Sequence, residues 1–116
     1  MALMVTRLAP IPLQFWRSDS GRELARDWFR SLPDQDRHVV GSDLRRVQFG
    51  WPIGMPLVKP LGDGLWELRS SLPSRREARV LFTADGQGIV VLHGFIKKSQ
   101  KTPRSDLVLA RKRMKE

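Results

Sequence analysis

Two arginines on neighbouring predicted strands are the residues whose spacing most directly suggests chemistry. Arg69 and Arg79 lie inside two segments of alternating hydrophobicity, and a hairpin turn near residues 73–75 would set them almost opposite each other. Two guanidinium groups this close repel, so an anion is expected between them. A phosphate would fill that role, because arginine binds it through two parallel hydrogen bonds. Glu67 and Glu77 could fill it as well, in an Arg–Glu ladder across the hairpin, and the residues leave both interpretations open.

A cluster of lysines follows the last predicted strand. Lys97, Lys98 and Lys101 stand where this strand feeds a loop, a place where rigid scaffolds often present functional groups. The same residues could instead form a solubilising loop. His93, four residues before Lys97, could serve as a general acid or base near neutral pH. A histidine in such an apolar run is, however, more often a satisfied core residue.

Other catalytic chemistries find little support in the sequence. The chain has no cysteine, which excludes disulfides, thiolate zinc sites and cysteine nucleophiles. His38 and His93 lie on different predicted elements, and the acidic residues show no ligand spacing, so no metal site is predicted. The sequence also has no convincing Ser-His-Asp arrangement and no phosphate-binding glycine loop.

The first half of the chain is predicted to be helical after one short strand. Residues 8–17 favour a strand whose prolines restrict it to a sheet edge. A helical hairpin is expected over residues 20–49, with Ser20 and Glu23 as a capping box and Pro33 opening the second helix. The apolar face of the hairpin is formed by Leu24, Ala25, Trp28, Phe29, Leu32, Val40, Leu44 and Val47.

The second half has the two-residue periodicity of strands. The predicted strands, separated by turns, are residues 57–61, 65–72, 77–84 and 88–96. The last of them is nearly all apolar, as expected for a central strand buried on both faces. Thr102 and Pro103 are expected to open a C-terminal helix. This order predicts an α+β fold in which helices pack on one face of a mainly antiparallel sheet.

Length and charge narrow the class of protein. The 116 residues fit a single domain spanning residues 1–116. The net charge is +9, and residues 59–116 hold 13 basic against 6 acidic residues. Such one-sided positive charge indicates a polyanionic partner, most commonly nucleic acid, with an acidic protein as the alternative. Neither a signal peptide nor a membrane-spanning apolar stretch is found, so a cytoplasmic location without membrane contact is expected.

Three segments together resemble a known family. GLWELR (64–69), EARVLF (77–82) and IVVLHGFIKKSQKTP (89–103) are similar to the phage-derived HigB-like branch of the RelE/ParE toxin superfamily. The likeness extends over roughly residues 12–113. It implies a RelE-like α+β fold, in which an N-terminal helical hairpin packs on a small curved, mainly antiparallel sheet and a short C-terminal helix follows.

The resemblance also implies an activity and partners. Members of this branch are toxins of type II toxin–antitoxin pairs that cut mRNA in the ribosomal A site. The RNA 2′-hydroxyl attacks the adjacent phosphate and leaves a 2′,3′-cyclic phosphate, so neither a metal nor a cofactor is expected. The expected partners are a cognate helix-turn-helix antitoxin, mRNA and ribosomal RNA.

The family pattern also assigns roles to individual residues. Arg69 and Arg79 would hold the scissile phosphate and stabilise its extra negative charge in the transition state. Lys97 and Lys98 match a lysine pair that would grip RNA, and one of them could carry a proton. His93 is not assigned by the family pattern, but its place on the last predicted strand near these lysines adds it to the expected catalytic group. The residues expected to contact RNA or the ribosome are Lys59, Lys97, Lys98, Lys101 and Arg104.

Two questions stay open at this level. The chain contains no tyrosine, whereas many RelE-type nucleases use a terminal tyrosine or histidine, so the general base and acid are not assigned. His93, Glu67 or a lysine could serve. The alternative functions are a ParE-like gyrase poison without nuclease activity and a phage-related accessory protein. The arginine pair favours the nuclease, because a gyrase binder needs no paired phosphate clamp.

Overall fold

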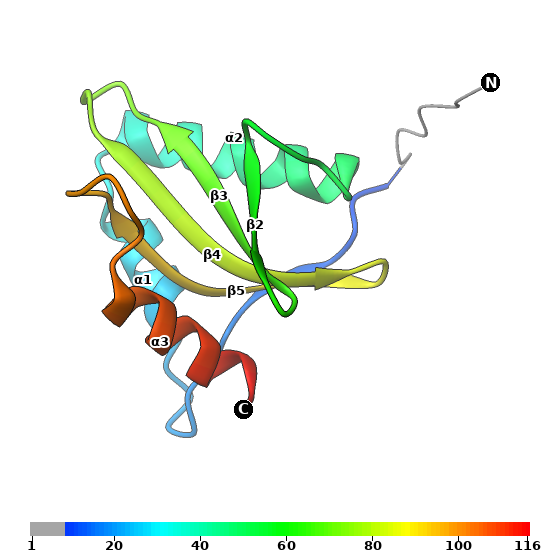
Figure 1. The fold of residues 1–116 in the computed structure, drawn as a ribbon. Helices are drawn as coiled ribbons and strands as arrows, with labels where there is room; N and C mark the ends of the chain where they lie inside the picture. The colour runs from blue at the N-terminus through cyan, green and yellow to red at the C-terminus, as the bar shows by residue number, and fades with distance from the viewer. Residues whose placement is uncertain (1–8) are drawn as a thin grey trace.

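The computed structural model describes residues 9–116, which form three helices and one five-stranded sheet. The strands are β1 (Leu13–Phe15), β2 (Val58–Gly62), β3 (Leu65–Ser71), β4 (Glu77–Asp85) and β5 (Gly88–Ile96). The helices are α1 (Leu24–Ser31), α2 (Asp34–Gly50) and α3 (Arg104–Met114). The strand order is β1-β5-β4-β3-β2, and only the β1–β5 pair is parallel. The predicted α+β fold with a mainly antiparallel sheet is confirmed (Figure 1).

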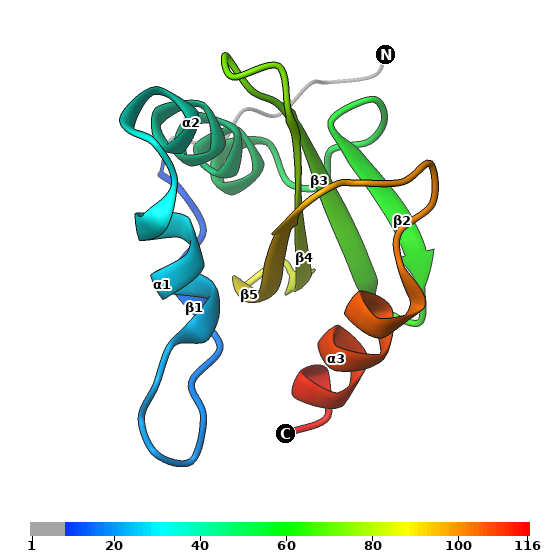
Figure 2. The same ribbon diagram turned by 90° about the vertical axis from the view of Figure 1, so that its left-hand side faces the viewer.

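Helices cover both faces of the sheet (Figure 2). The α1–α2 hairpin packs on one face as predicted, whereas α3 packs on the opposite face. The expectation of helices on one face alone was therefore incomplete. Leu81 and Leu92 form a second apolar face, which Ala110 of α3 covers, and all three residues are buried. Apolar side chains on both faces of the inner strands need cover from both sides.

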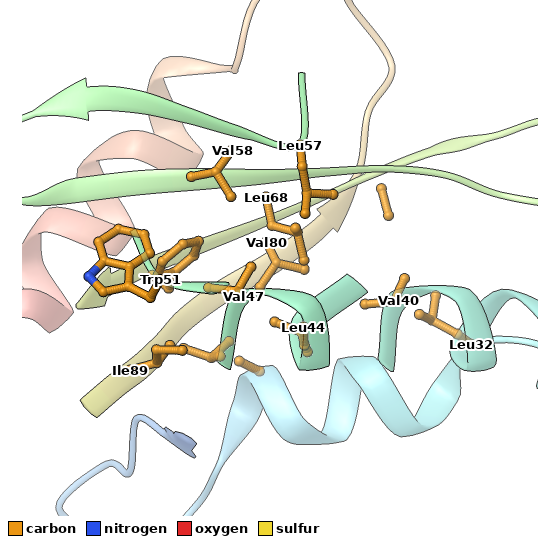
Figure 3. Close-up of a cluster of buried hydrophobic side chains, with 14 of the residues drawn as sticks. Leu32, Val40, Leu44, Val47, Trp51, Leu57, Val58, Leu68, Val80 and Ile89 are labelled. Carbon is orange, nitrogen blue, oxygen red and sulfur yellow. The ribbon is translucent and has the colours of Figure 1, made fainter. Parts of the chain in front are cut away.

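The larger core lies between the helical hairpin and the sheet (Figure 3). Val40, Leu44 and Val47 of α2 are buried at the spacing predicted for one helical face. They pack with Leu68 and Val80 of the two middle antiparallel strands. This core holds β3 and β4 rigidly, and these two strands carry the arginine pair.

Helix α1 approaches the sheet through a tight aromatic contact. Trp28 lies over Gly94 of β5 so closely that a Cβ atom at Gly94 would fall 2.3 Å from two atoms of the indole ring. Only glycine leaves room for this approach of helix to strand. Trp28 is half-buried and packs against the larger core, as predicted for the apolar face of the hairpin.

Some local predictions at the helix ends are wrong. The capping box of Ser20 and Glu23 is absent, because α1 begins after Glu23, whose carboxylate pairs with Arg17 at 3.1 Å. Pro33 stands at the N-cap position of α2, one residue before the predicted place. Thr102 makes no cap at α3, because its hydroxyl is bonded to the sheet instead.

The N-terminal strand is shorter than predicted. β1 spans three residues, whereas residues 8–17 were expected to be extended, and residue 8 lies outside the described residues. β1 is nevertheless an edge strand, as its prolines predicted. Leu13 lies beside Ile89, so β1 pairs with a segment that is distant in the sequence.

Candidate functional site

The two arginines occupy directly opposed positions of β3 and β4, as predicted. Arg69 pairs with Arg79 in the antiparallel register. Arg79 is 4% exposed, whereas the side chain of Arg69 is 31% exposed. Burial lowers the pKa of Arg79 and repulsion from Arg69 lowers it further, against the opposing effect of Glu67 and Glu77. Arginine stays protonated at neutral pH, so Arg79 is a buried cation, with carboxylate oxygens of Glu67 at 3.8 Å and Glu77 at 3.9 Å.

A buried carboxylate lies between the two guanidinium groups. Oε1 of Glu67 is 3.8 Å from Nε of Arg69 and 3.8 Å from Nε of Arg79. Part of the Arg–Glu ladder considered from the sequence is thus present. These distances are those of ion pairs rather than short hydrogen bonds. Both guanidinium groups therefore keep N–H donors for a further anion.

The second oxygen of Glu67 holds the segment between β5 and α3. The hydroxyl of Thr102 donates a hydrogen bond to Oε2 of Glu67. This bond ties the lysine-bearing residues 97–101 to the arginine pair, and it explains why Thr102 does not cap α3. Sequence reasoning missed this role, although Thr102 belongs to the KTP end of the family-like segment.

These groups line a cleft of about 280 Å³ between the sheet and the start of α3. The basic residues lining it are Lys59, Arg69, Arg79, Lys97 and Lys101. Among the described lining residues, Glu67 is the one carboxylate, and Phe95 and Leu107 supply apolar surface. The excess of cations makes the cleft suitable for an anionic ligand such as a phosphodiester.

A second hollow of about 620 Å³ lies on the other side of the arginine pair, against α2 and the loop after it. Arg69 and Arg79 line it together with Arg46, Asp43 and Glu77. Arg46 pairs with Asp43 at 3.5 Å, and two carboxylates offset much of the positive charge here. The smaller cleft is therefore the better candidate for an anion site.

Three predicted site residues lie outside the cleft. Nε2 of His93 is 2.6 Å from Oδ1 of Asp106 in α3, and the imidazole stacks on Phe95 with 5.6 Å between ring centroids. His93 thus resembles the satisfied core histidine that the sequence left as an alternative. Lys98 is exposed and lines a separate groove, and Arg104 is exposed at the first residue of α3. The functional roles of these three residues stay predictions.

Part of the C-terminal positive charge has a structural role. Arg113 is buried, donates a hydrogen bond to the carbonyl of Leu92 at 2.8 Å and lies over the ring of Trp16 at 4.6 Å. Arg111 donates to the carbonyl of Leu61 at 3.0 Å. Both arginines fasten α3 to the sheet. The net charge of this region therefore overstates the charge that is open to a partner.

The described residues 9–116 contain no group of three or more His, Cys, Asp or Glu side chains placed to hold a metal ion. Within the same range, no helix combines the length and apolar character needed to cross a lipid bilayer. The groups at hand in the cleft are guanidinium and ammonium ions and one carboxylate. Such groups can bind a phosphate, stabilise added negative charge and move a proton.

Comparison with known proteins gives two concordant results. Residues 27–115 match the family described as "Phage derived protein Gp49-like". The chain is also similar to the "Probable endoribonuclease HigB1" of Mycobacterium tuberculosis, in the strains CDC 1551 / Oshkosh and ATCC 25618 / H37Rv. In each case the identity is 34% over 101 residues, which is 87% of this chain and 79% of the relative. The range matched by the family includes every described residue that lines the cleft.

Proposed function

The chain belongs to the phage-derived Gp49-like family of HigB-like toxins, and from this premise we propose that it is a ribosome-dependent mRNA endonuclease. In this proposal it is the toxin of a type II toxin–antitoxin pair, and residues 1–116 act as one domain in the cytoplasm without a metal or cofactor. The observation that carries the proposal is the convergence of Arg69 and Arg79 with Lys97 and Lys101 on one cleft.

In the proposed reaction, the 2′-oxygen of the RNA attacks the adjacent phosphorus and the bond to the 5′-oxygen breaks. The products are a 2′,3′-cyclic phosphate and a 5′-hydroxyl, so no water is consumed. Arg69 and Arg79 would stabilise the negative charge that accumulates on the phosphate oxygens. Arg79 is fixed by a hydrogen bond to the carbonyl of Ala78 at 3.0 Å, so it needs little reorganisation during the reaction. Loss of one such fixed donor typically lowers the rate by about 10²–10³.

Proton transfer is assigned to groups that line the cleft. Oε1 of Glu67 faces the arginine pair and is the proposed acceptor of the 2′-hydroxyl proton. Lys97 or Lys101 is the proposed donor to the leaving 5′-oxygen. His93 is the candidate suggested by the sequence, but its imidazole is bonded to Asp106 outside the cleft. We therefore expect His93 to support α3 rather than to act on RNA.

The remaining basic residues supply the proposed contacts with RNA and the ribosome. The proposed contact residues are Lys59, Lys97, Lys98, Lys101 and Arg104. Binding of this kind releases counterions and weakens as salt rises. The second proposed partner is a cognate helix-turn-helix antitoxin.

The deciding experiment adds purified protein to a translating extract with a defined mRNA and maps new 5′ ends by primer extension. An Arg69→Ala/Arg79→Ala variant tests the clamp. A Lys112→Ala/Lys115→Ala variant is the matched control, because it also removes two positive charges but at the exposed C-terminal end of α3. We expect cuts that require translation, persist in the lysine control and vanish in the arginine variant.

Other outcomes would change the proposal in defined ways. Cuts that appear without translation would retain the nuclease and remove its dependence on the ribosome. An intact message with normal translation would contradict the nuclease and favour a gyrase poison, for which a supercoiling assay is the next test. Equal loss of cleavage in both variants would show that overall charge matters and that the arginine pair has no special role.

A further inference from the structure

A second basic surface adjoins the cleft on the other side of Lys97. It is a groove of about 720 Å³ lined by residues of α1, the β3–β4 turn, the end of β5 and the segment after it. The β3–β4 turn and the segment after β5 lie at the same end of the sheet (Figure 1). The charged and aromatic residues that define this Trp28 groove are Trp28, Arg75, Arg76, Glu77, Lys97 and Lys98. None of its cations except Lys97 lines the cleft described above.

The Trp28 groove has more positive than negative charge, because Glu77 is the one carboxylate among its described lining residues and also lies 3.9 Å from Arg79. Arg75 and Lys98 are exposed, and neither they nor Lys97 form a side-chain hydrogen bond or ion pair with any residue in the range 9–116. Arg76 is paired with the buried Asp36 at 3.2 Å, yet its side chain stays 44% exposed. Four cations against one lining carboxylate leave an excess of positive charge, so the groove would gain stability from a polyanion.

The backbone that carries these cations is already fixed. The amide of Leu72 donates to the carbonyl of Arg76 at 2.9 Å, and the amide of Arg75 donates back to Leu72 at 2.9 Å, which closes the turn. The amide of Lys97 donates to the carbonyl of Glu77 at 2.7 Å, which ties the lysine segment to the same end of the sheet. A preorganised array of this kind binds a ligand with a smaller loss of conformational entropy.

An aromatic ring lies among these cations. Trp28 is half-buried, and its indole is held against Gly94, where there is no side chain to separate it from the strand. Sites for single-stranded nucleic acid combine a cationic track for the phosphates with aromatic rings on which bases stack. Charge alone would also suit an acidic protein, but the aromatic ring beside the cations favours RNA.

We propose that the Trp28 groove binds single-stranded RNA as a continuation of the cleft, with one base stacked on Trp28. The strand would pass from the arginine pair over Lys97, which lines the cleft, the Trp28 groove and a shallow hollow of about 350 Å³ between Lys98 and Gln100. This inference rests on the proposed function, because it extends the same RNA strand beyond the scissile phosphate.

The test measures binding of 2′-O-methyl oligonucleotides, which cannot be cleaved, by fluorescence anisotropy over a series of salt concentrations. A trinucleotide fills the cleft only, whereas an octanucleotide reaches the groove. Arg75→Ala/Lys98→Ala should weaken the octanucleotide at least tenfold and the trinucleotide much less, because Arg75 and Lys98 line the groove and not the cleft. Arg75 has a positive φ of 66° in the turn. Alanine also has a Cβ atom, so the substitution adds no backbone strain at this position. The control variant is Lys112→Ala/Lys115→Ala.

Two further readouts separate the groove from non-specific attraction. The slope of log affinity against log salt for the octanucleotide should fall by about 0.7 for each phosphate that is no longer neutralised, or about 1.4 for the double variant. An abasic scan of the octanucleotide should find one position whose base contributes about 5- to 150-fold in affinity. Trp28→Leu, checked for folding by circular dichroism, should abolish the loss of affinity at that abasic position. Trp28→Phe should keep part of this loss.

Several results would overturn the inference. It is wrong if the groove variant weakens the trinucleotide and the octanucleotide equally, or if it weakens neither. It is also wrong if polyglutamate binds as tightly as the octanucleotide and loses as much in the variant, because the groove would then suit an acidic protein. The binding test uses neither a ribosome nor cleavage, so its result stands even if the translation assay shows no cuts. Cleavage with unchanged octanucleotide binding would refute the groove alone.

Discussion

Replacing Gly94 with alanine should strongly destabilise the protein because of one contact. The added Cβ would lie 2.3 Å from Cε3 and Cζ3 of Trp28 and 2.9 Å from Cδ2. Non-bonded carbon atoms prefer separations of about 3.5–4.0 Å, so the overlap is about 1.2 Å or more. Neither partner can yield easily. The indole ring is rigid, and Gly94 is paired with Val80 in the β4–β5 ladder.

The magnitude follows from the cost of overpacking. Extra atoms in a packed core cost about 1–3 kcal/mol, occasionally more, and this overlap belongs at the upper end, at about 3 kcal/mol. With an unfolding entropy of about 2.1 cal/mol/K per residue, Tm should fall by about 12 °C. Urea unfolding followed by circular dichroism measures the change. We expect the midpoint to fall and the m-value to stay constant.

Two variants isolate the contact. Gly86→Ala is the matched control, because no atom lies within 4 Å of the added Cβ, and it should change the stability by less than about 0.5 kcal/mol. Trp28→Ala should itself cost about 3–5 kcal/mol through the loss of packing. In a Trp28→Leu background, most of the cost of Gly94→Ala should disappear, since the clashing ring is gone. A Gly94→Ala variant as stable as Gly86→Ala, or a cost that persists without the ring, would refute this account.

The remaining predictions concern the site and its support. Thr102→Val should lower the cleavage rate about tenfold while Thr102→Ser retains it, because the hydroxyl ties the end of the lysine segment to Glu67 in the cleft. Single-turnover rates measure this effect. Glu67→Gln should abolish most cleavage, whereas His93→Ala should leave the cleavage rate unchanged. Strong loss of cleavage in a stable His93→Ala protein would restore His93 as the candidate general acid or base. Burial raises the pKa of Asp36, but hydrogen bonds from Ser74 and Arg76 together hold this pKa below its usual value. The carboxyl group of Asp36 therefore has a lower pKa in the folded protein than in the unfolded chain. The ionised group stabilises the fold at pH values above its unfolded-state pKa, and this stabilisation is lost as pH falls through its folded-state pKa. Asp36→Asn should therefore flatten the acid limb of the stability curve below about pH 4 in urea titrations.

The opposition of Arg69 and Arg79 could be predicted because it depends on local information. The length of the turn fixes the register of a hairpin, and side-chain alternation fixes the faces. The cleft could not be predicted in the same way. It depends on α3 folding back over the second face of the sheet, which no local pattern encodes. The role of Thr102 was hidden for the same reason, since its partner Glu67 is 35 residues away in the chain.

The wrong cap predictions have a related cause. Ser20 and Glu23 have the spacing of a capping box, and Thr102 precedes a proline that could open a helix. Each side chain had a competing partner that local spacing does not reveal. Glu23 binds Arg17, and Thr102 binds the carboxylate in the cleft. A polar side chain near a helix end is therefore a weak predictor of a helix cap when an ion-pair partner or a buried charge lies within its reach.

The pairing of β1 with β5 sets the order in which this protein can form during synthesis. Leu13 pairs with Ile89, which the ribosome adds 76 residues later. Pairing between such distant segments is slow, because the entropy of closing the loop is given up before the strands can pair. The cleft is delayed in the same way, since its lining extends to Leu107 of the 116 residues. A nascent chain therefore has no complete cleft until Leu107 has been added, and a product truncated before β5 would lack both the strand that pairs with β1 and the lysine segment.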